Sequence, residues 1–232
     1  QAGQDVVLPY GEAVTDADLK PYVDKVATSV TVGPVPEAQI EQKLLPQLAM
    51  RVGDAVNMDY IRHDLNVIGA TGLFSTVKPS FTTVPEGVSL NYTVQMNPVV
   101  KKIDIVGNES LSTGDLMKLV ATTPGTTLNT AIVSHDVANI NTAFANAGYM
   151  MSRVSDVRLD DEGVLHIAIS EPRIENINLR GNTKTKNKVI MRELRMKKGD
   201  IFNKNAASRS IQRVYNTGYF EDVNVRLLPG QR

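Results

Sequence analysis

The 232-residue chain contains no cysteine, so disulfide bonds and thiolate chemistry are excluded, and the absence is compatible with an oxidising compartment. The chain also lacks any apolar run that approaches the ~20 residues of a membrane-spanning helix. Its first residues, Gln1 to Gln4, lack the basic segment followed by an apolar segment that marks a signal peptide. We therefore expect ordinary globular domains, and either a signal has been removed or the chain is an excised fragment.

An excess of charge of one sign is missing as well, because 25 Lys and Arg side chains balance 25 Asp and Glu side chains. The distribution along the chain is uneven. After Glu171 there are 14 basic and 5 acidic residues, which leaves 11 basic and 20 acidic residues before it. A basic C-terminal part could contact an anionic partner such as a membrane surface. The alternative interpretation is a solvated helix face.

The chain does have short motifs of glycine, proline and asparagine that recur at a near-constant interval. Gly-Pro or Gly-Asn pairs begin at Gly33, Gly107 and Gly181, each 74 residues from the previous one. Three further markers keep this register: Gly53, Gly125 and Gly199; Gly72, Gly148 and Gly218; Asn97-Pro98 and Glu171-Pro172. Self-similarity at a fixed period is typical of a tandem array of one small domain. We expect a polar leader (residues 1–21), repeat 1 (22–98), repeat 2 (99–171) and repeat 3 (172–232).

Each repeat is predicted to begin with a strand and a short helix. Alternating apolar residues at 26–32, 103–105 and 177–179 end at a Gly-Pro or Gly-Asn pair, which is typical of a strand followed by a turn. A short amphipathic helix follows, and the second glycine marker ends it.

The second helix of each repeat has the clearest boundaries. Asn57, Asn129 and Asn203 are predicted N-caps, since an asparagine side chain can accept a hydrogen bond from an unpaired helix N–H. An apolar residue precedes each cap and another follows four residues later, which is the pattern of a hydrophobic staple. The third glycine marker is expected to end each helix in a left-handed conformation.

Two more strands complete repeats 1 and 2, at 77–83 and 88–94, and at 151–159 and 165–169. Repeat 3 has a candidate strand at 223–228 but none after it. The predicted fold class is therefore α+β: a tandem array of β-α-α-β-β units, each a three-stranded mixed sheet covered by two helices. We expect the third unit to lack its last strand and the natural polypeptide to continue beyond Arg232.

This ordered set of markers resembles the POTRA (polypeptide-transport-associated) domains of the Omp85 superfamily. The resemblance covers about Tyr22 to the end of the chain. It rests on Val35-Pro36-Glu37, Gly107-Asn108, Gly181-Asn182, Gly72-Leu73-Phe74 and Gly218-Tyr219-Phe220. Gly148-Tyr149-Met150 departs from the pattern at its third position, and Gly33-Pro34 replaces Gly-Asn.

By this resemblance the chain would be the periplasmic part of an outer-membrane protein and would continue into an outer-membrane β-barrel. Within the superfamily, tandem units of this number are most like those of outer-membrane protein assembly factors. The implied partners are unfolded β-barrel precursors and accessory assembly subunits. Alternatives are the POTRA region of a TamA-like protein or a two-partner secretion transporter, and a purely structural periplasmic spacer.

The resemblance also places the first and third strands side by side and parallel, so that the second strand forms an edge. An exposed edge can accept a strand of another chain, a binding mode called β-augmentation. The expected client-binding residues are Val77, Lys78, Ser80, Phe81, Met151, Arg153, Val154, Val157, Val223 and Val225. Pro79 removes one donor from the first of these edges, which should make it the weaker acceptor.

Five further residues are assigned roles in the array. Phe74, Met150 and Phe220 are candidates for the rim of the groove beside each edge, with core packing as the alternative. Pro98 and Pro172 are expected interdomain joints, because proline restricts the residue before it to extended geometry.

Signals for catalysis, cofactors or metals are not found in the sequence. His63, His135 and His166 lack the spacing of metal ligands, and His135-Asp136 is interpreted as solvated polar surface. The basic stretch from Lys184 to Lys198 has no interleaved aromatic residues, so we expect no nucleic-acid binding. We predict that the protein is not an enzyme.

Overall fold

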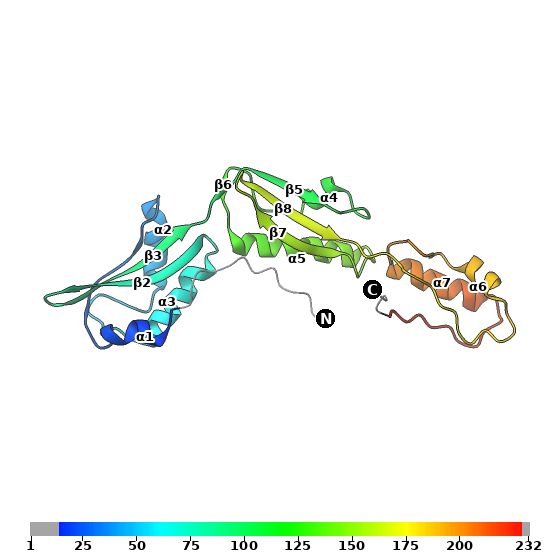
Figure 1. Ribbon diagram of the computed structural model, residues 1–232, viewed down its shortest axis with the longest axis horizontal. Helices are drawn as coiled ribbons and strands as arrows, with labels where there is room; N and C mark the ends of the chain where they lie inside the picture. The colour runs from blue at the N-terminus through cyan, green and yellow to red at the C-terminus, as the bar shows by residue number, and fades with distance from the viewer. Residues whose placement is uncertain (1–13, 229–232) are drawn as a thin grey trace. The chain divides into compact units, whose positions relative to one another are not determined.

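The computed structural model describes residues 14–228, and its helices and strands follow the expected order in repeats 1 and 2 (Figure 1). In chain order the elements are α1 (Asp16–Leu19), η1 (Lys20–Tyr22), β1 (Ala27–Gly33), α2 (Ala38–Leu44), η2 (Leu45–Gln47), α3 (Met58–Ala70), β2 (Phe74–Val84), β3 (Gly87–Met96), β4 (Val99–Val100), β5 (Lys102–Val106), α4 (Thr113–Met117), β6 (Thr126–Thr127), α5 (Thr130–Asn146), β7 (Arg153–Leu159), β8 (Val164–Ser170), α6 (Asn187–Glu193) and α7 (Lys204–Asn216).

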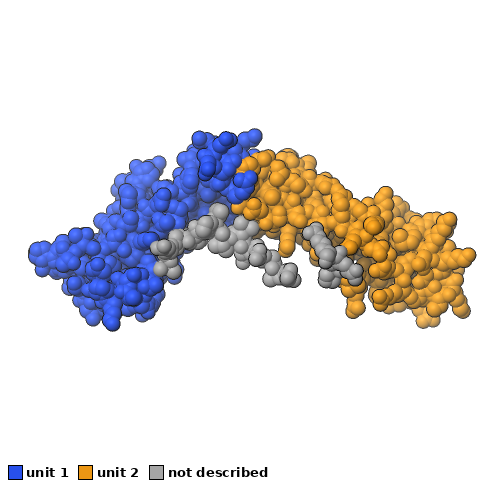
Figure 2. Space-filling view, viewed as in Figure 1, with its two compact units in different colours: residues 1–103, 121–135, 158–165 blue, residues 104–120, 136–157, 166–232 orange. Residues whose placement is uncertain are grey.

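The described residues form two compact units, which Figure 2 shows in different colours. The first unit contains residues up to 103 together with 121–135 and 158–165, and the second contains residues 104–120, 136–157 and those from 166 onward. The boundary between the units therefore runs through repeat 2.

Repeat 1 contains a three-stranded mixed sheet in the order β1-β3-β2. β3 is parallel to β1 and antiparallel to β2, and Leu90 at its centre lies opposite Val30 on one side and Phe81 on the other. The strand that comes last in the sequence is thus the central strand of the sheet. This topology confirms the predicted fold class for the repeat.

The core of repeat 1 lies between this sheet and its helices. Val88, Leu90 and Tyr92 alternate along β3 and are fully buried, as the period of a strand requires. Ile61 and Ile68, seven residues apart and therefore on one face of α3, join the same buried cluster. In Figure 1, α3 lies along β2, which it contacts.

The helix caps predicted from the repeated asparagines are all present. Asn57, Asn129 and Asn203 each accept hydrogen bonds at Oδ1 from the backbone N–H groups two and three residues later. The predicted staple residues on either side of the caps are buried in all three repeats: Val56 and Ile61, Leu128 and Val133, Phe202 and Ala207. The sequence pattern therefore located the start of each long helix correctly.

Repeat 2 has a second three-stranded sheet in the order β5-β8-β7, again with the last strand in the centre. Leu165, Ile167 and Ile169 alternate along β8, and all three are buried. A short antiparallel pair precedes this sheet, in which β4 lies beside β6 with Val100 opposite Thr126.

Repeat 3 has helices α6 and α7, but within the described residues it contains no strand. The strands predicted at 177–179 and 223–228 are therefore wrong for this chain. The physical reason follows from the strand order in repeats 1 and 2, where the third strand separates and bonds to both of the others. In repeat 3 no third strand bonds to residues 177–179 or 223–228 among the described residues, so neither predicted strand has a strand partner. Ile174, which precedes the first of them, pairs with the loop at Gly199 and Asp200.

The predicted polar leader also needs correction. Residues 1–13 lie outside the described residues, but α1 and η1 belong to repeat 1. Leu19 is only 2% exposed and is part of the repeat 1 core, with Val14 and Tyr22 packed against it. Periodicity alone missed this contribution, because a four-residue helix is too short to show an amphipathic pattern.

One buried polar side chain recurs seven residues after each helix cap: Asp64, Asp136 and Ser210 are all at most 1% exposed. Asp64 accepts hydrogen bonds from the N–H groups of Ala49 and Met50 and from the Tyr92 hydroxyl. Ser210 accepts one from the N–H of Arg195. These contacts supply partners for backbone groups of the loop between the two helices. The interpretation of Asp136 as solvated surface is therefore wrong.

Glu171, the residue before Pro172, ties three segments of repeat 2 together. Its carboxylate accepts hydrogen bonds from the N–H of Glu109, from the N–H of Ser110 at 2.9 Å and from the hydroxyl of Ser152 at 2.9 Å. Partial burial raises the pKa of Glu171, but these hydrogen bonds outweigh that effect and hold its pKa below the ordinary value.

The Tyr92→Phe variant removes the hydroxyl that donates to Asp64 Oδ2 at 2.5 Å. We expect the free energy of unfolding at about pH 7 to fall by about 1–2 kcal/mol, because a buried bond to a carboxylate is lost. Burial and the neighbouring carboxylate raise the pKa of Tyr92 far above its ordinary value of 10. Wild-type stability should therefore fall above about pH 10, where Tyr92 ionises only in the unfolded chain.

The variant lacks this alkaline effect, so urea unfolding should give a smaller difference between the two proteins at about pH 11 than at about pH 7. An equal difference at both pH values would contradict the assignment.

The Glu171→Gln variant keeps the shape of the side chain but removes its charge. Because the pKa of Glu171 is lowered on folding, its stabilisation is present above the ordinary value of 4.5 and is lost as the pH falls through the folded-state pKa. We expect the variant to be less stable by about 1 kcal/mol at neutral pH, with a deficit that shrinks as the pH falls below 4.5. Unfolding by urea at neutral and at acid pH measures this, and a deficit that does not shrink in acid would count against the carboxylate.

Candidate functional site

A three-stranded sheet has two edges, and in repeat 1 backbone pairing covers the start of the first strand. The same contact recurs at the corresponding segments of repeats 2 and 3. The loop between the two helices folds back beside the start of this strand or of the segment that leads into it. The second glycine marker donates its N–H there: Gly53 to Ala27 O, Gly125 to Val100 O, and Gly199 to Ile174 O, at 2.7–2.8 Å. All three glycines have φ near +90°, a left-handed conformation that other residues rarely adopt. The second strand is therefore the edge that lacks this cover.

On β2 the antiparallel ladder determines which backbone groups face outward. The N–H of Val88 donates to Val26 O at 2.8 Å, on the side of β3 that faces β1. Its partner Thr83 is therefore in a non-hydrogen-bonded pair, whose N–H and C=O groups point away from β3. The backbone groups at alternate positions of β2 also point away from β3, at Phe81, Pro79 and Val77. No strand among residues 14–228 pairs with this outer edge.

The predicted client-binding residues of repeat 1 thus fall into two classes. Val77 and Phe81 direct backbone groups outward, whereas Lys78 and Ser80 direct theirs toward β3. Phe81 is half-buried and its ring stacks on Tyr22, with the ring centroids 4.3 Å apart. Pro79 occupies an outward position, where its missing N–H breaks no bond within the sheet.

In repeat 2 the candidate edge is β7. Val154 and Val157 are buried, whereas Arg153 is exposed. The N–H of Val154 donates to Oδ1 of Asn141 in α5 at 2.8 Å, so this donor is already satisfied. β2 lacks a donor at Pro79, and the donor at Val154 of β7 is already used. Each edge thus offers one N–H fewer than a regular strand, which reduces the expected difference in binding strength between the two edges. Met151 precedes the strand and is 48% exposed.

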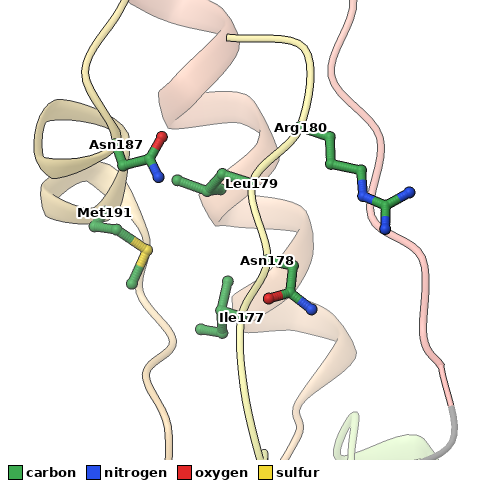
Figure 3. A pocket seen from close by; sticks show the side chains of 6 residues that line it. All are labelled: Ile177, Asn178, Leu179, Arg180, Asn187 and Met191. Carbon is green, nitrogen blue, oxygen red and sulfur yellow. The ribbon is translucent and has the colours of Figure 1, made fainter.

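The candidate residues of repeat 3, Val223 and Val225, are not in a strand, so no strand edge is formed there among residues 14–228. The opposite segment is extended but unpaired. Figure 3 shows Ile177 and Leu179 pointing to one side and Asn178 and Arg180 to the other, which is the alternation of a strand. Ile177 and Leu179, with Asn187 and Met191 of α6, line an open pocket of about 550 Å³.

The three rim candidates occupy different environments. Phe74 is 2% exposed and belongs to the repeat 1 core, which favours core packing over a place on the groove rim. Met150 is 57% exposed and Phe220 is half-buried. Core packing, the alternative interpretation, therefore holds for Phe74.

Both predicted joints are held by hydrogen bonds. Pro98 accepts one from the N–H of Leu128 at 2.8 Å, and the buried Asn97 donates to Gly72 O and to Leu128 O. An open pocket of about 600 Å³ lies beside Pro98 and is also lined by Lys101 and Arg158. After Pro172, Arg173 donates to Gly199 O at 2.8 Å and forms an ion pair with Glu109.

Among residues 14–228, no three His, Asp or Glu side chains come together in an arrangement that could hold a metal ion. Over the same residues, no helix combines the length and the apolar character needed to cross a bilayer. The candidate site is the set of outward-facing backbone groups along β2 and β7.

Two features of the sheet edges were not predicted from the sequence. The covering loop needs a glycine that turns back onto the first strand, and the recurrence of Gly53, Gly125 and Gly199 was its only signal. The repeat pattern does not mark Asn141, because the corresponding positions in α3 and α7 hold Gly69 and Tyr215.

Comparison with solved structures places this architecture among known proteins. The POTRA1-3 region of the periplasmic domain of Omp85 from Anabaena superposes with a TM-score of 0.75 at 27% identity, over 89% of this chain and 90% of that one. The N-terminal domain of Omp85 from Thermosynechococcus elongatus gives a TM-score of 0.74 at 27% identity, over 88% and 91%.

The curated relatives are much longer proteins, and their matches cover less of this chain. Outer envelope protein 80 of rice chloroplasts (Oryza sativa subsp. japonica) is 24% identical over 76% of this chain. The outer membrane protein assembly factor BamA of Neisseria meningitidis serogroup B is 29% identical over 55% of it. The matches span only 28% and 17% of those proteins.

Two stretches of the chain match the model of a known protein family. Residues 98–171 and 172–232 each match the POTRA model, described as a surface antigen variable number repeat. These two matches cover more than half of the sequence, and the similar solved structures extend the likeness to most of the rest. This chain therefore belongs to the POTRA family of the Omp85 superfamily.

Proposed function

We propose that this chain is the periplasmic polypeptide-binding arm of an Omp85-type protein and receives unfolded outer-membrane protein precursors by β-augmentation. The observation that carries the proposal is the difference between the two edges of the repeat 1 sheet. Backbone pairing with the inter-helix loop covers the start of β1, whereas no strand of the described part of the chain lies beside the outer edge of β2. A precursor strand would therefore add at β2, and in repeat 2 at β7.

The chemistry of such an edge suits a receptor for many clients. N–H and C=O groups recur along every polypeptide, so pairing with them is largely independent of the client sequence. Side chains at alternate positions then contribute a modest preference. In this role the chain binds and hands on polypeptides without catalysing a reaction.

The names of the relatives support this assignment. BamA is an outer membrane protein assembly factor, and the similar solved structure from Anabaena is part of a periplasmic domain. Docking of accessory assembly subunits belongs to the same proposal. The alternatives are a TamA-like protein, a two-partner secretion transporter and a periplasmic spacer that binds no client.

The basic residues of repeat 3 provide a second candidate contact. Seven side chains between residues 184 and 198 are exposed and positively charged: Lys184, Lys186, Lys188, Arg192, Arg195, Lys197 and Lys198. An anionic membrane surface would attract such a cluster, and the attraction would weaken as salt is added.

Amide hydrogen exchange on addition of a client peptide tests the proposal. A peptide with the alternating apolar pattern of an outer-membrane protein strand should protect the amides of Val77, Phe81 and Thr83, which face outward. The amides of Lys78, Ser80 and Thr82 already bond to β3 and should change little. The same peptide with proline at alternate positions is the control. If no amide of β2 or β7 gains protection, the spacer becomes the preferred function.

A pair of variants at one exposed position separates backbone pairing from side-chain contact. Thr83→Pro removes an outward N–H on an edge strand, where proline is tolerated, and should weaken peptide binding by about fivefold, or about 1 kcal/mol. Thr83→Ala keeps the N–H and should bind as the wild type does. Equal loss in both variants would indicate side-chain recognition instead of strand addition.

A further inference from the structure

The third glycine marker does more than end a helix: in repeats 1 and 2 it also contacts the following repeat. The carbonyl of Gly148 accepts a hydrogen bond from the N–H of Lys204 at 2.8 Å, and the carbonyl of Gly72 accepts one from the N–H of Thr130 at 2.9 Å. Lys204 is the first residue of α7, and Thr130 is the first residue of α5. Each of these contacts lies within a single compact unit.

The contact satisfies a group that a helix cannot satisfy by itself. The first N–H groups of a helix have no partner within the helix. Asn203 accepts from the second and third of them in α7, through Asn205 and Ala206. The preceding repeat supplies the acceptor for the first, through Gly148. Asn203 also donates from Nδ2 to Ala147 O at 3.1 Å, so one cap residue connects both repeats.

Only glycine fits at this place. A Cβ on Gly148 would lie 2.7 Å from Asn203 Oδ1 and 2.9 Å from Asn205 Nδ2. A Cβ on Gly72 would lie 2.4 Å from Asn129 Oδ1 and 2.6 Å from the backbone nitrogen of Ala131. In both repeats the capped helix start therefore rests directly on the glycine backbone.

We propose that this glycine and the capped start of the next long helix form a specific repeat-to-repeat lock. The glycine has two roles that can be separated. It adopts a left-handed φ that ends its own helix, and it leaves room for the next cap. The lock fixes the register between consecutive repeats and does not depend on whether the chain binds clients.

Repeat 3 provides an internal control, because Gly218 has the first role without the second. Its φ is +76°, close to the +73° of Gly72 and the +94° of Gly148. Nothing within residues 14–228 lies within 4 Å of a Cβ placed on Gly218. Alanine at Gly218 and alanine at Gly148 thus introduce the same kind of backbone strain, but only the latter collides with a helix cap.

The absence of cysteine allows the test to be made by double electron–electron resonance on the whole chain. Spin labels are attached at Lys118→Cys in repeat 2 and Arg209→Cys in repeat 3, both at exposed positions in one compact unit. We expect a single narrow distance peak for the parent protein and for Gly218→Ala. Gly148→Ala should lose that peak and give a broad distribution.

A second pair of variants tests the contact from the side of its hydrogen-bond donor. Proline is well tolerated as the first residue of a helix, and Asn203 before it has φ −127° and ψ 120°, which proline permits. Lys204→Pro removes the N–H that Gly148 accepts, and Lys204→Ala keeps it. We expect the narrow peak to be lost in Lys204→Pro and retained in Lys204→Ala.

Circular dichroism at the same temperature verifies that each variant keeps its helices, so that a broad distribution reports the joint and not unfolding. The proposal is overturned if Gly148→Ala and Lys204→Pro both keep the narrow peak. It is overturned equally if Gly218→Ala broadens the distribution as much as Gly148→Ala, since backbone strain alone would then account for the effect.

Discussion

Backbone pairing through a central strand is the constraint on which each repeat depends. β3 comes last in repeat 1, yet it bonds to β1 on one side and to β2 on the other. The first two strands of a repeat therefore form no sheet until the third has been placed between them. Repeat 3 shows the consequence, because its two candidate strand segments stay extended without partners while α6 and α7 are still formed and capped.

The same strand order creates the functional asymmetry of the sheet. One outer strand follows directly on the joint and is covered by the loop that returns from the first helix. The other outer strand follows the long helix and keeps its outward N–H and C=O groups unmatched by any strand of the described chain. Backbone pairing thus covers the start of one outer strand, and the outward groups of the other have no strand beside them among residues 14–228.

Much of this could be predicted from the sequence, for local reasons. The asparagine caps, the apolar residues of the staple and the glycines that end the helices act on neighbours within a few residues, so a linear pattern records them. Phe74 and Asp136 were harder to interpret. Whether an aromatic residue at a helix–strand junction faces a groove or the core, and whether an acid on a helix is solvated, depends on segments distant in the sequence. For Asp64, at the same place in repeat 1, those segments are the loop at Ala49 and the strand at Tyr92.

The sequence by itself determined the interval between the repeated markers, the order of the two main helices and three main strands in repeats 1 and 2, and the ends of the long helices. Those features depend on residues whose conformational preferences act within one or two turns of the chain. The tertiary structure alone decided that residues 14–22 belong to the first core, that Asn141 satisfies Val154, and that Gly72 and Gly148 hold the next helix. Each of these results from a close approach between segments far apart in sequence, which no local pattern encodes.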